Sequence, residues 1–208
     1  MTRFTLALVA RSGRWVAPAV VYLVWLALVL ANPGPALTNG ANMFFSVVVF
    51  AVWFAVVTGN VDDDPHRDLC AAVVGSPARL HACRAGATVA ASAAVAVVTA
   101  LATGATGDLG HRSLLATTAW SVALLVAGSL IGSAIGVFLH RPVIDGVAWS
   151  VVLASAASLA VVLLPPVQAV LRHLDHGSTR GVGILLVVAA AVAALAVVAS
   201  AVIADRRS

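Results

Sequence analysis

The chain consists of long apolar stretches separated by short polar segments. Six of the stretches approach or exceed the about 20 residues that a helix needs to cross the hydrocarbon core of a bilayer. They are Trp15–Ala31, Ala41–Thr58, Ala85–Ala102, Leu114–Leu139, Val143–Leu164 and Val182–Ala204. The pattern therefore predicts an all-α membrane protein with six transmembrane helices over residues 15–208, preceded by an N-terminal segment of residues 1–14.

The N-terminal segment, residues 1–14, mixes apolar residues with Arg3, Arg11 and Arg14. A helix lying in the headgroup region of the membrane fits this mixture, and an ordinary charged tail fits it equally well. No signal peptide is expected, because the first apolar stretch is followed by the turn sequence Asn32-Pro33-Gly34-Pro35 and by no clear small-residue cleavage site.

The loop before the last span, residues 165–181, is predicted to contain a short re-entrant helix on the outer side. The double proline Pro165-Pro166 must end the fifth span, because proline lacks the N–H that a helix interior needs. Apolar residues then recur at helical spacing, namely Val167, Val170, Leu171 and Leu174. The neighbouring His173, Asp175 and His176 could ligate a metal or could simply be solvated polar residues, and no metal site is assigned.

The arginines fall unequally on the two sides of the predicted bundle. One side holds nine, Arg3, Arg11, Arg14, Arg67, Arg79, Arg84, Arg141, Arg206 and Arg207, and the other holds three, Arg112, Arg172 and Arg180. By the positive-inside rule both termini and the loop 59–84 are predicted to be cytoplasmic. We expect a multi-pass protein of the plasma membrane of a bacterium, in contact with anionic lipid.

Composition excludes several classes of function. Only 10% of residues are charged and 62% are hydrophobic, against about 25% charged in soluble domains, so lipid must solvate most of the surface. The chain has no lysine and hence no P-loop, and the spans contain no deep Arg or Asp to serve a proton relay or a catalytic pair. We therefore expect neither an enzyme nor a proton-coupled carrier, and the scattered arginines do not indicate nucleic acid binding.

The predicted cytoplasmic loop, residues 59–84, carries the strongest local signals. Asp64 before Pro65 is a favourable helix start, and Gly75 and Pro77 provide a stop. The sequence thus predicts a short helix over residues 65–74 that lies across the membrane surface. By composition alone it could merely connect two spans.

A family resemblance gives this loop a further meaning. The stretches Arg67-Asp68-Leu69, Val74-Gly75-Ser76-Pro77-Ala78-Arg79 and Arg84-Ala85-Gly86 resemble the loop after the second helix in ABC-2 type permeases, the membrane subunits of ATP-binding-cassette exporters. That family's pattern is Arg-Glu, then Gly-Thr-Leu, then a Ser- or Thr-Pro step with a following Arg, and a basic residue opening the third helix. Here Asp68 replaces the Glu, and Cys70-Ala71 replaces the Gly-Thr.

The resemblance implies a coupling helix that docks into a separate ATPase subunit. The implied ATPase contacts are His66, Arg67, Asp68, Leu69, Ser76, Pro77 and Arg79. ATP and Mg²⁺ would bind in that partner, so no cofactor is expected in this chain. A second permease subunit, identical or paralogous, would complete the assembly.

The resemblance also implies a pathway between two permeases, along their first, second and fifth helices. The residues that could line it are Tyr22, Trp25, Asn42, Phe45, Trp53, Ser155 and Ser158. Because the interior is free of charge, the expected substrate is a hydrophobic or amphipathic small molecule, drug-like or lipid-like, and the family's usual direction is export. The alternatives are an ATP-independent carrier or flippase and a membrane protein that binds without transporting.

Small residues recur every fourth place in the fourth apolar stretch, at Gly128, Gly132 and Gly136. Such spacing lets two helix backbones approach closely. The contact could be a moving or dimeric one, or it could be tight packing within one subunit.

Overall fold

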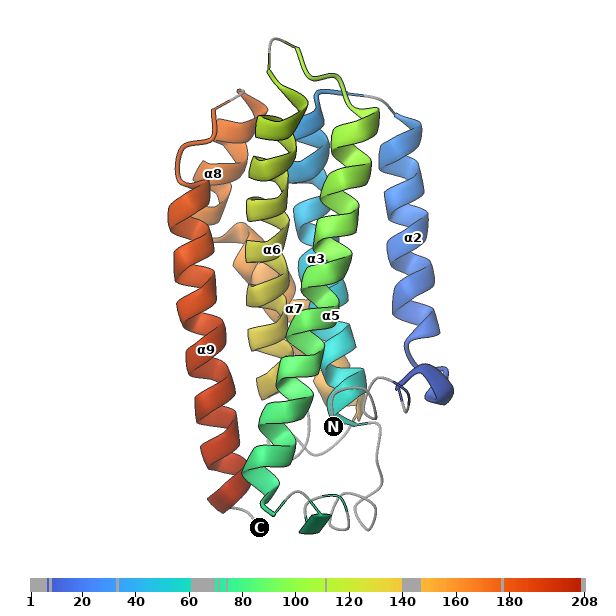
Figure 1. Cartoon of the computed structure of the whole chain (residues 1–208), viewed down its shortest axis with the longest axis vertical. Helices are drawn as coiled ribbons and strands as arrows, with labels where there is room; N and C mark the ends of the chain where they lie inside the picture. Colours follow the sequence, from blue (N-terminus) through green and yellow to red (C-terminus); the bar gives the residue numbers. More distant parts are fainter. Residues whose placement is uncertain are drawn as a thin grey trace.

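The computed structural model describes residues 7, 9–32, 34–60, 70, 72–73, 75–110, 112–139, 147–176 and 178–206. Within these residues the regular structure is helical, with one isolated bridge between Pro35 and Asp108. The helices are α2 (Val16–Ala31), α3 (Ala36–Gly59), α5 (Pro77–Thr106), α6 (Leu114–Phe138), α7 (Val147–Leu163), α8 (Pro165–Asp175) and α9 (Val182–Arg206). They form one elongated bundle whose long helices run along its axis (Figure 1). The predicted all-α class is confirmed.

Among the described residues, four helices are long and apolar enough to cross a membrane, namely α3, α5, α6 and α9. The pair α7 and α8, bent by 62° at the break between them, forms a fifth candidate. The first predicted span corresponds to α2, whose 16 residues reach only about 24 Å at 1.5 Å per residue, short of the about 30 Å of hydrocarbon. The structure therefore supports four to five spans, and six spans stay a prediction.

The break between α7 and α8 lies at the predicted double proline. Leu164 is the N-cap of α8, and Pro165 and Pro166 form its first turn, where no backbone donor is lost. The predicted apolar stripe faces the bundle, since Val167, Val170 and Leu174 are buried. A Cβ on Gly181 would lie 2.9 Å from Val170, so α8 packs beside the start of α9. The short helix is thus present, while its place on the outer side and its re-entry into a membrane stay predictions.

The centre of the bundle is the contact between α3 and α6. A Cβ on Gly132 would lie 2.8 Å from the Cβ of Ala51, and a Cβ on Gly136 would lie 2.6 Å from the carbonyl oxygen of Val52. The ring of Phe44 covers Gly128 in the same way. The glycine stripe therefore serves packing within one chain, because only glycine leaves room for α3 at this distance.

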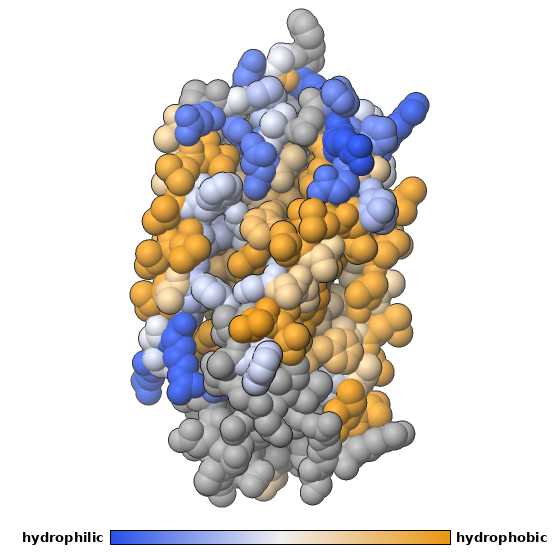
Figure 2. All heavy atoms as spheres, turned by 180° about the vertical axis from the view of Figure 1, so that it is seen from behind, coloured by the Kyte–Doolittle hydropathy of each residue, from blue (hydrophilic) through white to orange (hydrophobic). Residues whose placement is uncertain are grey.

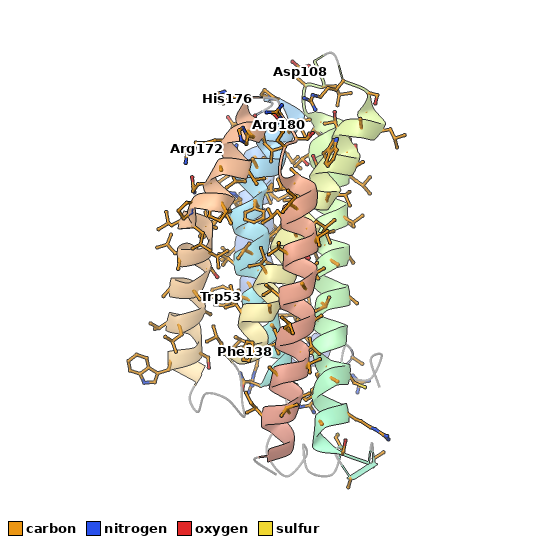
Figure 3. All side chains as sticks on the ribbon, turned by 90° about the vertical axis from the view of Figure 1, so that its left-hand side faces the viewer. Trp53, Asp108, Phe138, Arg172, His176 and Arg180 are labelled. Atoms are coloured by element: carbon orange, nitrogen blue, oxygen red, sulfur yellow. The ribbon has the colours of Figure 1, made fainter. Side chains whose placement is uncertain are left out.

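Apolar side chains cover the outside of the bundle between two polar ends. Figure 2 shows this band from behind, with hydrophilic residues gathered above it and at one lower corner. The exposed apolar residues of α9 include Ile184, Val187, Val188, Val192, Leu195, Val198 and Val202. In Figure 3, Asp108, Arg172, His176 and Arg180 lie together at one end. A band of this kind fits a lipid environment and fits no water-facing surface.

Candidate functional site

Helix α2 is weakly packed against the rest of the bundle. It is apolar on every side, and only Pro18 and Tyr22 are buried. Tyr22 attaches it to the bundle twice, because its hydroxyl is hydrogen-bonded to the hydroxyl of Thr99 on α5 and its ring packs on Phe50 of α3 at 5.0 Å between centroids. Helix α2 therefore stands beside α3 and leaves space between the two helices.

That space contains a cavity of about 420 Å³ in its middle part. The lining residues are Pro18, Val20, Val21, Tyr22, Val24 and Trp25 from α2, and Phe45, Ser46, Val49, Phe50 and Trp53 from α3. Aromatic rings from both helices dominate, and they offer large, rigid apolar surfaces to a ligand. Phe45 and Trp25 are also open to the outside of the bundle, so the cavity can be reached from the apolar band.

A second cavity, of about 460 Å³, adjoins the first at Pro18 and Trp53. Its lining continues to the end of both helices, with Arg14, Ala17, Val56, Val57 and Asn60. Here Arg14 donates a hydrogen bond from Nη1 to the carbonyl oxygen of Asn60, over 2.8 Å. We call the two cavities together the α2–α3 groove. It is apolar along its length and cationic at one end, which we call the Arg14 end.

The structure brings four of the seven predicted pathway residues into this groove. Tyr22, Trp25, Phe45 and Trp53 all line it. The other three are not among the lining residues: Asn42 is exposed on α3, Ser155 is exposed on α7, and Ser158 is buried with its hydroxyl bonded to Ala154 of its own helix at 2.7 Å.

Sequence reasoning missed the groove residues Arg14, Pro18 and Asn60. A helical wheel of the first stretch places Pro18 with Tyr22 and Trp25, so its position could have been found. Arg14 was assigned to orientation and to the headgroup region, because nothing in the sequence pairs it with the far end of α3.

Most of the predicted ATPase contacts lie outside the described residues, namely His66, Arg67, Asp68 and Leu69, as does most of the predicted helix 65–74. Ser76 and Pro77 begin α5: the Ser76 hydroxyl accepts from the backbone N–H of Arg79 at 3.2 Å, and Pro77 occupies the first turn. The Arg79 side chain is exposed. In physical terms the Ser-Pro step is thus a helix N-cap that leaves Arg79 on the surface.

Two further polar features lie near this part of α5. His81 and Arg84 are buried although they are ionisable, and His81 Nε2 is 2.8 Å from Ser200 Oγ on α9. The Ser200 hydroxyl donates to the Val197 carbonyl oxygen at 3.0 Å, so both bonds form together in the tautomer in which His81 Nε2 donates to Ser200.

Cys70 and Cys83 are free thiols. Among the described residues no three of His, Cys, Asp and Glu lie close enough to hold a metal ion.

Comparisons with protein-family models, with curated proteins and with solved structures found no match to this chain.

Proposed function

We propose that this chain is the membrane-spanning permease subunit of an ATP-binding-cassette exporter, moving a hydrophobic or amphipathic small molecule with energy from a separate ATPase subunit. The observation that carries the proposal is the α2–α3 groove. Aromatic residues from two helices converge there on a space that opens to the apolar band. A molecule dissolved in lipid could enter it sideways without crossing water.

The packing of α3 explains why the pathway should lie on the outside of this bundle. The α3–α6 contact is closed by glycine backbones, so no substrate can pass between these two helices. The opposite face of α3 is open. A second copy or a paralogue of this subunit, placed against α2 and α3, would enclose the groove between two chains, which is the assembly that we propose.

The loop 59–84 supports the proposed link to the ATPase. The described residues of the loop are those next to the two helices that it joins. Asn60, which contacts Arg14, ends α3, and Ser76, Pro77 and the exposed Arg79 begin α5. A helix docking into an ATPase needs an exposed basic and apolar surface beyond the membrane. Arg67 and Leu69 in the same loop are the residues that we propose to provide it.

The decisive experiment is purification of the tagged, crosslinked chain from its native membranes. We expect an ATPase with the sequence Gly-x-x-x-x-Gly-Lys-Ser/Thr to co-purify with the unaltered chain. The double substitution Arg67→Ala with Leu69→Ala should abolish that association, while Arg180→Ala with Leu115→Ala, the same residue types at the opposite end, should leave it intact. Recovery of no such ATPase, or its recovery with the loop variant, would contradict the proposal and favour an ATP-independent carrier or a binding protein.

Orientation is tested separately by cysteine labelling in intact cells. We propose that both termini and the loop 59–84 face the cytoplasm, so an impermeant maleimide should label Ser178→Cys and should not label native Cys70 or Cys83. A double substitution of the two native cysteines by serine removes their background. Labelling of Cys70 from outside would reverse the orientation.

A further inference from the structure

The α2–α3 groove ends at a positive charge. Arg14 lies exposed immediately before α2 and reaches the carbonyl oxygen of Asn60, which caps α3. A guanidinium has five N–H donors, and the structure shows this hydrogen bond using one of them. The side chain therefore closes the apolar groove with a group that can bind an anion and remain fixed to α3.

The length of the groove matches one leaflet of a bilayer. From Arg14 to Trp25 the chain rises by roughly 17 Å at 1.5 Å per residue. Half of a hydrocarbon core of about 30 Å is about 15 Å. A molecule with its charged head at Arg14 would thus reach the middle of the membrane near Trp25.

We propose that the α2–α3 groove binds an anionic phospholipid, with its phosphate on Arg14 and an acyl chain between α2 and α3 along Trp53 and Tyr22. The apolar walls select a hydrocarbon chain, and the cation selects a net negative head over a zwitterionic one. That this lipid is also the transported molecule rests on the proposed function, whereas its binding does not.

The site can be tested by quenching of tryptophan fluorescence with lipids brominated on the acyl chain. The full-length chain would carry Trp53 as its single tryptophan, with the others replaced by Phe, in phosphatidylcholine nanodiscs containing increasing brominated phosphatidylglycerol or brominated phosphatidylcholine. A matched reporter would keep only Trp149, which is 66% exposed on α7 and does not line the groove. We expect half-maximal quenching of Trp53 at about fivefold less phosphatidylglycerol than phosphatidylcholine, and equal quenching of Trp149 by both lipids.

The charge is tested by three substitutions in the Trp53 reporter. Arg14→Gln should remove the preference for phosphatidylglycerol, while Arg14→Lys should keep most of it. Arg11→Gln, which removes an exposed arginine three residues away that does not line the groove, should change nothing. Equal quenching of unaltered Trp53 by both lipids, survival of the preference in Arg14→Gln, or an equal preference at Trp149 would overturn the proposal.

Failure of this inference and failure of the proposed function give different results. A chain that binds phosphatidylglycerol in the groove but associates with no ATPase would keep the lipid site and lose the exporter. A chain that associates with an ATPase but shows no lipid preference would remain a permease for another molecule.

Discussion

Helix α3 makes two opposite kinds of contact on its two faces. Towards α6 its backbone is so close to Gly132 and Gly136 that a single added methyl group has no room. Towards α2 it carries Phe45, Phe50 and Trp53, and cavities remain between the two helices. Both faces are apolar, so hydrophobicity does not distinguish them.

The two faces of α3 show that close packing of the backbones, more than apolarity, determines which helices pack tightly in this bundle. Lipid tails are as apolar as leucine, so helices in a membrane gain little from hiding apolar surface from each other. They gain from close packing, which glycine permits at the α3–α6 contact. Large rings at the α2–α3 contact keep the helices apart, and the space between them is available to a lipid-soluble molecule.

The largest expected effect is a difference in stability between substitutions of two adjacent residues of α3. Phe44 is fully buried against Gly128, whereas Phe45 is 41% exposed and lines the groove. We expect Phe44→Ala to lower the free energy of unfolding by about 3–5 kcal/mol, because it leaves a cavity in the packed core. Phe45→Ala should change it by about 0.5 kcal/mol or less.

Unfolding of both variants in detergent micelles, followed by circular dichroism, measures this difference. Binding of brominated phosphatidylglycerol at Trp53 should show the reverse order, with Phe45→Ala weaker than the unaltered chain. Equal destabilisation by the two substitutions would mean that the two faces of α3 do not differ as described.

A second prediction compares two glycines inside helices. Gly132→Ala would place a methyl group 2.8 Å from Ala51 Cβ and closer still to the carbonyl oxygen of Val48, which as backbone cannot move aside. We expect a loss of about 1–3 kcal/mol in the free energy of unfolding. Gly86→Ala on α5 meets no atom within 4 Å, and replacing glycine within a helix should stabilise it by up to about 1 kcal/mol.

The two glycine variants should therefore shift the melting temperature in detergent in opposite directions. Destabilisation by Gly86→Ala, or tolerance of Gly132→Ala, would contradict the description of α6 as the closed side of the bundle.

The helices themselves could be predicted from the sequence because apolar runs fix them. The fourth stretch was predicted to end at Leu139 and α6 ends at Phe138, and the last was predicted from Val182, where α9 begins. The third was predicted to begin at Ala85, but α5 begins at Pro77. Polar residues concealed this extension, since His81 and Arg84 look like loop residues and are instead buried, His81 against Ser200 of α9.

The candidate site could be predicted only in part, because a sequence shows which residues share a helix face and not which helices meet. The spacing of Tyr22 and Trp25 places them on one face of α2, yet the sequence does not show that this face meets Phe45 and Trp53 of α3. Ser158 was proposed as lining, although α7 is apolar all round and its sequence carries no sign of which side is buried. In both cases the packing of the helices determines which residues line the groove, and the sequence of one helix does not show it.

The smallest expected effect concerns the attachment of α2. The Thr99 hydroxyl donates to Val95 of its own helix at 2.8 Å, so the Tyr22 hydroxyl must donate to Thr99. Tyr22→Phe removes this hydrogen bond and keeps the ring beside Phe50. Because such bonds between membrane helices contribute about 0.6 kcal/mol on average, we expect a loss of that size. A double-mutant cycle that combines Tyr22→Phe with Thr99→Val should give a coupling energy of the same size between the two residues. The matched cycle with Thr103→Val, a buried hydroxyl bonded within α5, should give none. Zero coupling between Tyr22 and Thr99 would mean that ring packing alone holds α2 at the groove.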